Sequence, residues 1–185
     1  MKKIALFLFS LLAISLFAGC ASMPESNGKD STLIYGCARY NGLYVFGGKD
    51  KSMSSVKIDG IQVMVMNLDD GMTYAATTNS EGEFTIAGVT PGHYIVKYLG
   101  TEYKYDGKKW KLRYNVPSKE KSNFTVRNGV TNIGRIVVNV DPDSGCDYVT
   151  WATDLEKVAE LFKKNHPGSK WLDANWSTPL DESAE

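Results

Sequence analysis

Histidine and cysteine are scarce in this sequence, whose 185 residues include two histidines, His93 and His166, and three cysteines. A zinc peptidase takes two ligands from a His-x-x-Glu pair and a third from elsewhere, which leaves a coordination position open for water. The residue three places after His93 is Val96, and the residue three places after His166 is Ser169. The nucleophile elbow G-x-S-x-G and the dinucleotide fingerprint are also missing. We therefore expect a protein without enzymatic activity, metal or cofactor.

The chain also lacks an excess of charge of either sign. Its 21 Lys and Arg side chains are balanced by 21 Asp and Glu side chains. Proteins that bind nucleic acid usually carry a concentrated positive field over the phosphates. We therefore expect no nucleic-acid partner.

Long apolar runs are missing except at the N-terminus, where the uncharged run Ile4 to Phe17 is too short to span a bilayer comfortably. Two lysines precede this run and small residues follow it before Cys20, which is the order of an export signal. The end of the run, LFAGC, resembles the lipobox of bacterial lipoproteins, whose cysteine is acylated and becomes the first residue of the mature chain. The resemblance implies a signal peptide over residues 1–19, a lipid on Cys20 and a location in the bacterial cell envelope. Because Ala21 rather than aspartate follows the cysteine, we expect the outer membrane.

Residues 20–32 have the composition of a tether, rich in Ser, Asn, Gly, Pro and charged residues and without apolar periodicity. As a flexible coil, this segment would hold the following domain about 19 Å from the lipid. A folded domain is then predicted over residues 33–140.

Within that range, β-type patterning recurs at nearly regular spacing and no helical period intervenes. Turn sequences such as DDG, NSEG, TPG and RNG separate the runs, which is typical of a β-sandwich or barrel. The predicted strands are 33–40, 43–46, 61–67, 72–78, 83–87, 93–99, 109–116, 123–127 and 132–140. The sequence therefore predicts a mainly β fold.

The stretch TTNSEGEFTIAGVTPGHYIV makes the pattern more specific. Asn79 can bond the backbone ahead of it while Gly82 closes a hairpin, and Pro91 followed by Gly92 sets up a second reversal. Residues 60–99 resemble the carboxypeptidase regulatory-like domain, which implies a transthyretin-like or Ig-like β-sandwich and no particular activity. The positions that match are Thr78, Gly82, Phe84, Ile86, Gly88, Pro91, Gly92 and Tyr94.

Residues 141–185 are predicted to be a connector and a helical appendage. Leu155, Val158, Ala159 and Phe162 share one helical face, and Thr153 with Glu156 has the spacing of a capping box. The helix should end at His166-Pro167-Gly168. Three tryptophans of this part, Trp151, Trp171 and Trp176, are expected to dock the appendage on the sandwich rather than to bind a ligand.

The segment Tyr103 to Lys121 holds seven basic residues and two acidic ones. Trp110, Leu112 and Tyr114 alternate in it with Lys109, Lys111 and Arg113, so one face is apolar and the other basic. We expect a solvated edge strand, whose lysines prevent pairing with another sheet. The alternative is a surface for an anionic partner formed by Lys109, Lys111 and Arg113.

Two cysteines remain after lipidation of Cys20. Because exported proteins can keep disulfides, Cys37 and Cys146 are a candidate pair, although both could be separate thiols. Cys146 lies in the acidic run DPDSGCD, which lacks the Gly and Glu positions of an EF-hand and is favoured as a polar connector.

These observations predict a membrane-anchored lipoprotein that acts as a non-enzymatic binding or assembly module, with a protein or glycan partner in the envelope. An accessory subunit of a glycan or peptide hydrolase and a structural component of a secretion machine remain alternatives, the second by analogy of fold alone.

Overall fold

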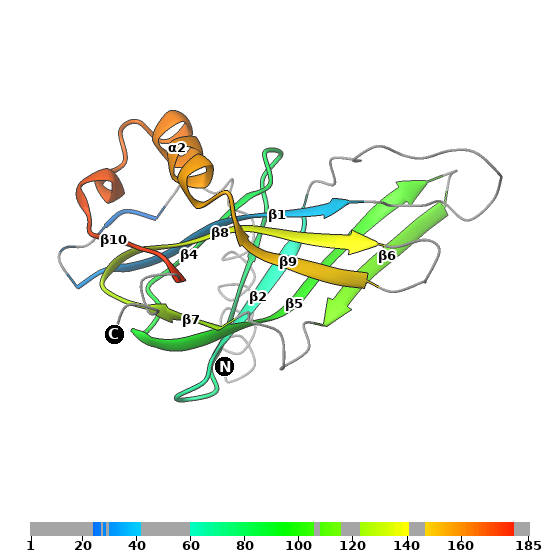
Figure 1. The fold of residues 1–185 in the computed structure, drawn as a ribbon, viewed down its shortest axis with the longest axis horizontal. Helices are drawn as coiled ribbons and strands as arrows, with labels where there is room; N and C mark the ends of the chain where they lie inside the picture. The colour runs from blue at the N-terminus through cyan, green and yellow to red at the C-terminus, as the bar shows by residue number, and fades with distance from the viewer. Residues whose placement is uncertain are drawn as a thin grey trace, which may run out of the picture.

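The computed structural model describes residues 24–26, 28, 30–41, 60–105, 108–115, 123–140 and 147–179. Several predictions fall outside these ranges: the signal peptide, the lipid site Cys20, the strand at 43–46 and Cys146. Within them lie strands that form two sheets, one α-helix and one 3-10 helix. The protein is mainly β, as predicted, and forms a β-sandwich with a helical appendage near its C-terminus (Figure 1).

Sheet A has the strand order β10-β8-β1-β4, and β9 also pairs with β8. Its strands are β1 (Thr32–Asn41), β4 (Glu83–Ala87), β8 (Gly129–Val140), β9 (Asp147–Thr153) and β10 (Trp176–Ser177). The first and last long strands, β1 and β8, lie side by side and run parallel. The other long pairings in this sheet, β1 with β4 and β8 with β9, are antiparallel.

Sheet B has the strand order β3-β2-β5-β6, and β7 also pairs with β5. It contains β2 (Gln62–Asn67), β3 (Thr73–Thr77), β5 (Gly92–Tyr105), β6 (Lys108–Asn115) and β7 (Asn123–Val126), and all its pairings are antiparallel. Since β5 is long, β7 pairs with its first residues and β6 with its last, on the same side. The strand β6 is thus an edge strand, as predicted.

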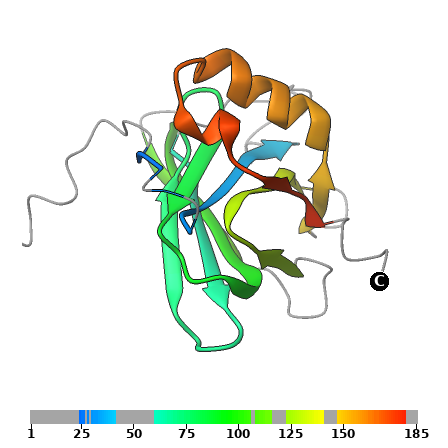
Figure 2. The same cartoon turned by 90° about the vertical axis from the view of Figure 1, so that its left-hand side faces the viewer.

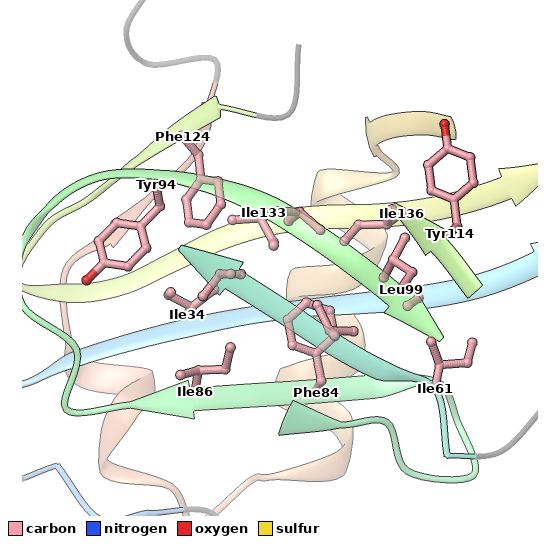
Figure 3. Close-up of a cluster of buried hydrophobic side chains, with 14 of the residues drawn as sticks. Ile34, Ile61, Phe84, Ile86, Tyr94, Leu99, Tyr114, Phe124, Ile133 and Ile136 are labelled. Carbon is pink, nitrogen blue, oxygen red and sulfur yellow. The ribbon is translucent and has the colours of Figure 1, made fainter. Parts of the chain in front are cut away.

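The main core fills the space between the two sheets (Figure 3). Alternate residues of each strand point into it, which is the period-2 burial expected of an antiparallel sandwich. Its buried members include Ile34 on β1, Val63 on β2, Phe84 on β4, Tyr94 on β5 and Ile136 on β8.

A second core lies on the other face of sheet A, under the helix α2 (Leu155–Asn165) and the 3-10 helix η1 (Lys170–Asp173). It contains Tyr35 and Cys37 from β1, Val158 and Phe162 from α2, and Trp171 from η1. The strand β1 is therefore buried on both faces, which explains why LIYGCARY reads as an almost continuous apolar run. The predicted docking role of Trp171 and Trp176 is confirmed, since both pack in this core, while Trp151 packs against the main one.

The C-terminal part differs from the prediction in two ways. The sandwich does not end at residue 140, because β9 and β10 continue sheet A beyond it. The capping box is wrong as well: Thr153 is the last residue of β9, and its hydroxyl donates to the Arg135 carbonyl at 3.2 Å. The helix instead starts after Asp154, whose φ of +56° makes the reversal out of the sheet.

Of the candidate disulfide pair, the described part of the structure includes Cys37. Cys37 is a free, buried thiol that faces the core under α2. Cys146 lies outside the described residues, so its pairing with Cys37 stays a prediction.

Candidate binding surface on the outer face of sheet B

The predicted anionic-partner patch lies on the outer face of sheet B. Lys111 and Arg113 are exposed and Tyr114 is buried, which confirms the predicted faces of β6 at these positions. The side chains of Lys109, Trp110 and Leu112 lie outside the described part of the structure. Lys111 pairs with Glu102 on β5 at 2.7 Å, and both side chains remain more than half exposed.

A row of side chains crosses three strands beside this patch. Gln62 on β2 pairs with Gly100 on β5, and Gly100 pairs with Arg113 on β6. The partly exposed Tyr98, two residues before Gly100, points to the same face. A Cβ added at Gly100 would overlap the Tyr98 hydroxyl and ring. The hydroxyl end of the phenol therefore lies over the glycine, in the same cavity that Gln62 and Arg113 line.

We call this group the Tyr98 platform and define it as Gln62, Tyr98, Glu102, Lys111 and Arg113, arranged around Gly100. The platform lines a shallow cavity of about 230 Å³. Among the described residues, Arg113 has no carboxylate within ion-pair distance, whereas Lys111 is neutralised by Glu102. The face of a phenol can bind a ring of the ligand, and a neighbouring guanidinium without a carboxylate partner can bind a carboxylate of the same ligand.

The other concentration of polar side chains is buried where α2 meets the β3–β4 turn. Glu83 accepts hydrogen bonds from the Tyr35 hydroxyl at 2.6 Å and from the amide groups of Asn79 at 2.9 Å and Asn165 at 3.0 Å. His166 lies 3.7 Å from the same carboxylate. We call these five residues the Glu83 cluster.

A His–Glu pair could serve as a general base, but this carboxylate is only 3% exposed and its oxygens already accept three hydrogen bonds. The donors come from β1, from the β3–β4 turn and from the end of α2. Burial, and then the hydrogen bond to Glu83, raises the pKa of Tyr35 above its ordinary range, so the phenol stays a donor. The cluster therefore fixes the appendage to the sandwich.

The turn beside this cluster is the one that the sequence predicted. The Asn79 side-chain oxygen accepts from the backbone N–H groups of Glu81 and Glu83, and Gly82 has a φ of +82°. This geometry points the Glu83 side chain at α2. Sequence reasoning identified the turn but missed the cluster, because its members are spread from β1 to the end of α2.

Burial also raises the pKa of the Cys37 thiol, to about 11, although the nearby Arg135 guanidinium acts in the opposite direction. A buried thiol of this kind is a poor nucleophile. Within the described ranges, no group of three or more His, Cys, Asp or Glu side chains is placed to hold a metal ion. The helices of those ranges include none long and apolar enough to cross a membrane.

No protein-family model matches the chain, and no curated protein sequence does either. One solved structure with some similarity is that of a leucine-rich repeat protein from Bacteroides thetaiotaomicron VPI-5482, which is 17% identical over the aligned part. The match covers 62% of this chain and 14% of that chain, with a TM-score of 0.37. A likeness at that level gives no guide to function.

Proposed function

We propose that the protein is a lipid-anchored lipoprotein of the bacterial envelope and acts as a non-enzymatic binding module. The lipobox resemblance of LFAGC supports the anchor at Cys20. The β-sandwich is consistent with the carboxypeptidase regulatory-like resemblance of residues 60–99, which implies a scaffold and no chemistry of its own.

The ligand that the Tyr98 platform fits best is an acidic glycan. A sugar ring presents C–H groups on its face, which suit the exposed side of the phenol, and polar groups at its edge, which suit Gln62 and Arg113. A carboxylate on the ring would form a paired hydrogen bond with the guanidinium. The observation that carries this proposal is the position of Arg113, which has no carboxylate partner within the described ranges, beside Tyr98 on an open sheet face.

The test is calorimetric titration of the lipoprotein in detergent micelles with oligogalacturonate and with a neutral glucan of similar length. The double variant Lys111→Glu, Arg113→Glu should weaken binding of the acidic oligosaccharide by at least about tenfold, which is 1.4 kcal/mol. The matched control Lys157→Glu, Lys163→Glu reverses two exposed charges on α2 and should leave affinity unchanged. Equal affinity for the neutral glucan, or equal loss in both double variants, would contradict the proposal.

The anchor is tested separately by fractionation of cells. The wild type should sediment with outer membranes, and the Cys20→Ala variant should remain unprocessed or become soluble. If the variant fractionates with membranes as the wild type does, Cys20 is not the anchor.

A further inference from the structure

We propose that residues 24–31 form a docked linker, which holds one end of the sandwich against the lipid surface so that the tip of the β2–β3 hairpin contacts the bilayer through Leu68 and Met72. The inference rests on the lipid anchor at Cys20 proposed above and adds to it an orientation and a lipid-binding surface.

The linker is bound to the folded domain near its start. The indole N–H of Trp171, a side chain only 2% exposed, donates to the carbonyl of Pro24 at 2.7 Å, across 147 positions of sequence. Further along, the backbone N–H of Gly129 donates to the carbonyl of Ser31 at 2.8 Å. The Lys170 ammonium lies 3.9 Å from the Glu25 carboxylate, but both are exposed, so this pair contributes little. The free tether expected from composition is therefore attached at both of its described ends.

This attachment shortens the reach between lipid and domain. Only residues 20–23 separate the lipid site from the Pro24 carbonyl, and a fully extended chain spans at most about 3.5 Å per residue. The acylated Cys20 therefore stays within about 14 Å of Pro24, whose carbonyl is bonded to Trp171. A free coil from Cys20 to residue 32 would instead average ~19 Å. The end of the sandwich that carries Trp171 must face the bilayer closely.

The β2–β3 hairpin tip lies at this same end. Gly129, which is bonded to Ser31 of the linker, is the first residue of β8 and follows β7 closely in the chain. Val126, the last residue of β7, pairs with Gly92 at the start of β5. The backbone N–H of Leu68 then donates to the carbonyl of His93 at 2.7 Å. Figure 1 shows the linker, η1, the start of β5 and the hairpin tip on the left-hand side of the molecule, and Figure 2 shows η1 at the top of that side and the hairpin tip at its bottom.

The exposed large apolar side chains of the described part are both on that tip: Leu68 is 46% exposed and Met72 is 56% exposed. The two acids between them, Asp69 and Asp70, are also exposed, and each accepts a hydrogen bond from a nearby backbone N–H group. Asp69 accepts hydrogen bonds from the backbone N–H and lies 3.2 Å from the ring of His93, and Asp70 accepts from the backbone N–H of Met72. The tip thus presents two apolar side chains beside two carboxylates, an amphipathic form suited to the interface between zwitterionic headgroups and acyl chains.

Charge does not select the lipid in this arrangement. Exposed acids outnumber exposed bases here: Glu25 and Asp173 lie near Lys170, and Asp69 and Asp70 are on the hairpin tip. A surface of that kind has little attraction for anionic headgroups. The partner is therefore the apolar part of a bilayer, held close by the linker.

The same orientation accounts for the position of the Tyr98 platform. From Gly92 the strand β5 runs away from the linker end, and Gly100 lies eight positions along it, about 26 Å at ~3.3 Å per residue. Figure 1 shows β6 at the end opposite to η1 and β10. The platform would thus be presented away from the membrane, where a glycan of the envelope can reach it.

The test uses the full-length lipidated protein in phosphatidylcholine vesicles, with Cys146→Ser to leave Cys37 as the remaining native thiol. Burial of Cys37 keeps it unlabelled under native conditions. An environment-sensitive fluorophore is attached at Met72→Cys, or at Lys111→Cys as the matched control on the far end. The label at position 72 should show blue-shifted emission and be quenched by a lipid-borne quencher, while the label at position 111 should show neither effect. Added anionic lipid should change neither result.

Two further variants test the linker itself. A flexible insert of about twenty Gly and Ser residues before Pro24 leaves the Trp171 contact intact but extends the reach to about 27 Å as a coil. Trp171→Phe removes the indole donor and frees Pro24. Both should abolish lipid quenching at position 72 while the protein stays on the vesicles, and the insert does so without altering the folded domain.

The outcomes separate this inference from the proposed function. A water-exposed label at position 72 on vesicle-bound wild type would overturn the orientation and leave the anchor intact. Quenching that survives the insert would overturn the role of the linker. Failure of the wild type to associate with vesicles would overturn both the anchor and the inference.

Discussion

Replacement of Tyr35 by phenylalanine isolates the strongest single contact of the Glu83 cluster. The substitution removes only the hydroxyl, which donates to the Glu83 carboxylate at 2.6 Å from a fully buried ring. A short hydrogen bond to a charged group contributes about 1.5–3 kcal/mol to the free energy of unfolding. For a domain of this size that corresponds to a fall in Tm of about 3–12 °C.

The assay is urea denaturation of Tyr35→Phe, of Glu83→Gln and of the double variant. Because the two groups bond each other, their effects should not add, and the cycle should give a coupling energy of at least about 1 kcal/mol. The control Tyr98→Phe removes a hydroxyl from the partly exposed outer face and should change stability by less than about 0.5 kcal/mol. A Tyr35→Phe variant as stable as the wild type would refute the view that this carboxylate is held by charge-assisted bonds.

Three further predictions concern the second core, alkaline pH and the platform. Phe162→Ala should destabilise the protein by about 3–5 kcal/mol, because the ring is fully buried under α2, whereas Lys163→Ala should stay within about 0.5 kcal/mol by thermal denaturation. Burial raises the pKa of Cys37 to about 11 and that of Tyr94 to about 12, so both stay neutral in the folded chain at pH values where the unfolded chain ionises. The stabilisation from these two groups should be complete below their unfolded pKa values of about 9 and 10 and should be lost as pH rises above them. Urea midpoints that stay constant up to about pH 10.5 would contradict this. Gly100→Ala should displace Tyr98 and weaken oligogalacturonate binding by about tenfold, whereas Gly168→Ala, with open space around it, should not.

Local patterns predicted much of the fold. The strand at 83–87 was predicted with its observed bounds, because NSEG fixes the turn before it and GVTPG ends the run after it. The exposure of Lys111 and Arg113 on β6 was predicted from the alternation of apolar and basic residues alone. The helix over residues 155–165 was predicted from its apolar face, but its start was not, since the hydroxyl of Thr153 is used by sheet A.

Contacts between segments that are distant in the sequence could not be predicted from such local patterns. Composition predicted a free tether, and the buried indole of Trp171 attaches it at Pro24. The strand β9 lies in the range that was predicted to be a connector, because the predicted strands ended at residue 140. On the platform, Tyr98 was missed because its position depends on the irregular pairing between β2 and β5, which shifts the register near Met64, and on the space that Gly100 leaves for it.

The most direct test of the binding account is amide hydrogen exchange of the lipoprotein with and without oligogalacturonate. The account predicts slower exchange confined to the strands beneath the platform, near Gln62 on β2, from Tyr98 to Glu102 on β5 and from Lys111 to Arg113 on β6. Slower exchange at α2 and η1 instead, or no change anywhere at saturating oligosaccharide, would contradict it.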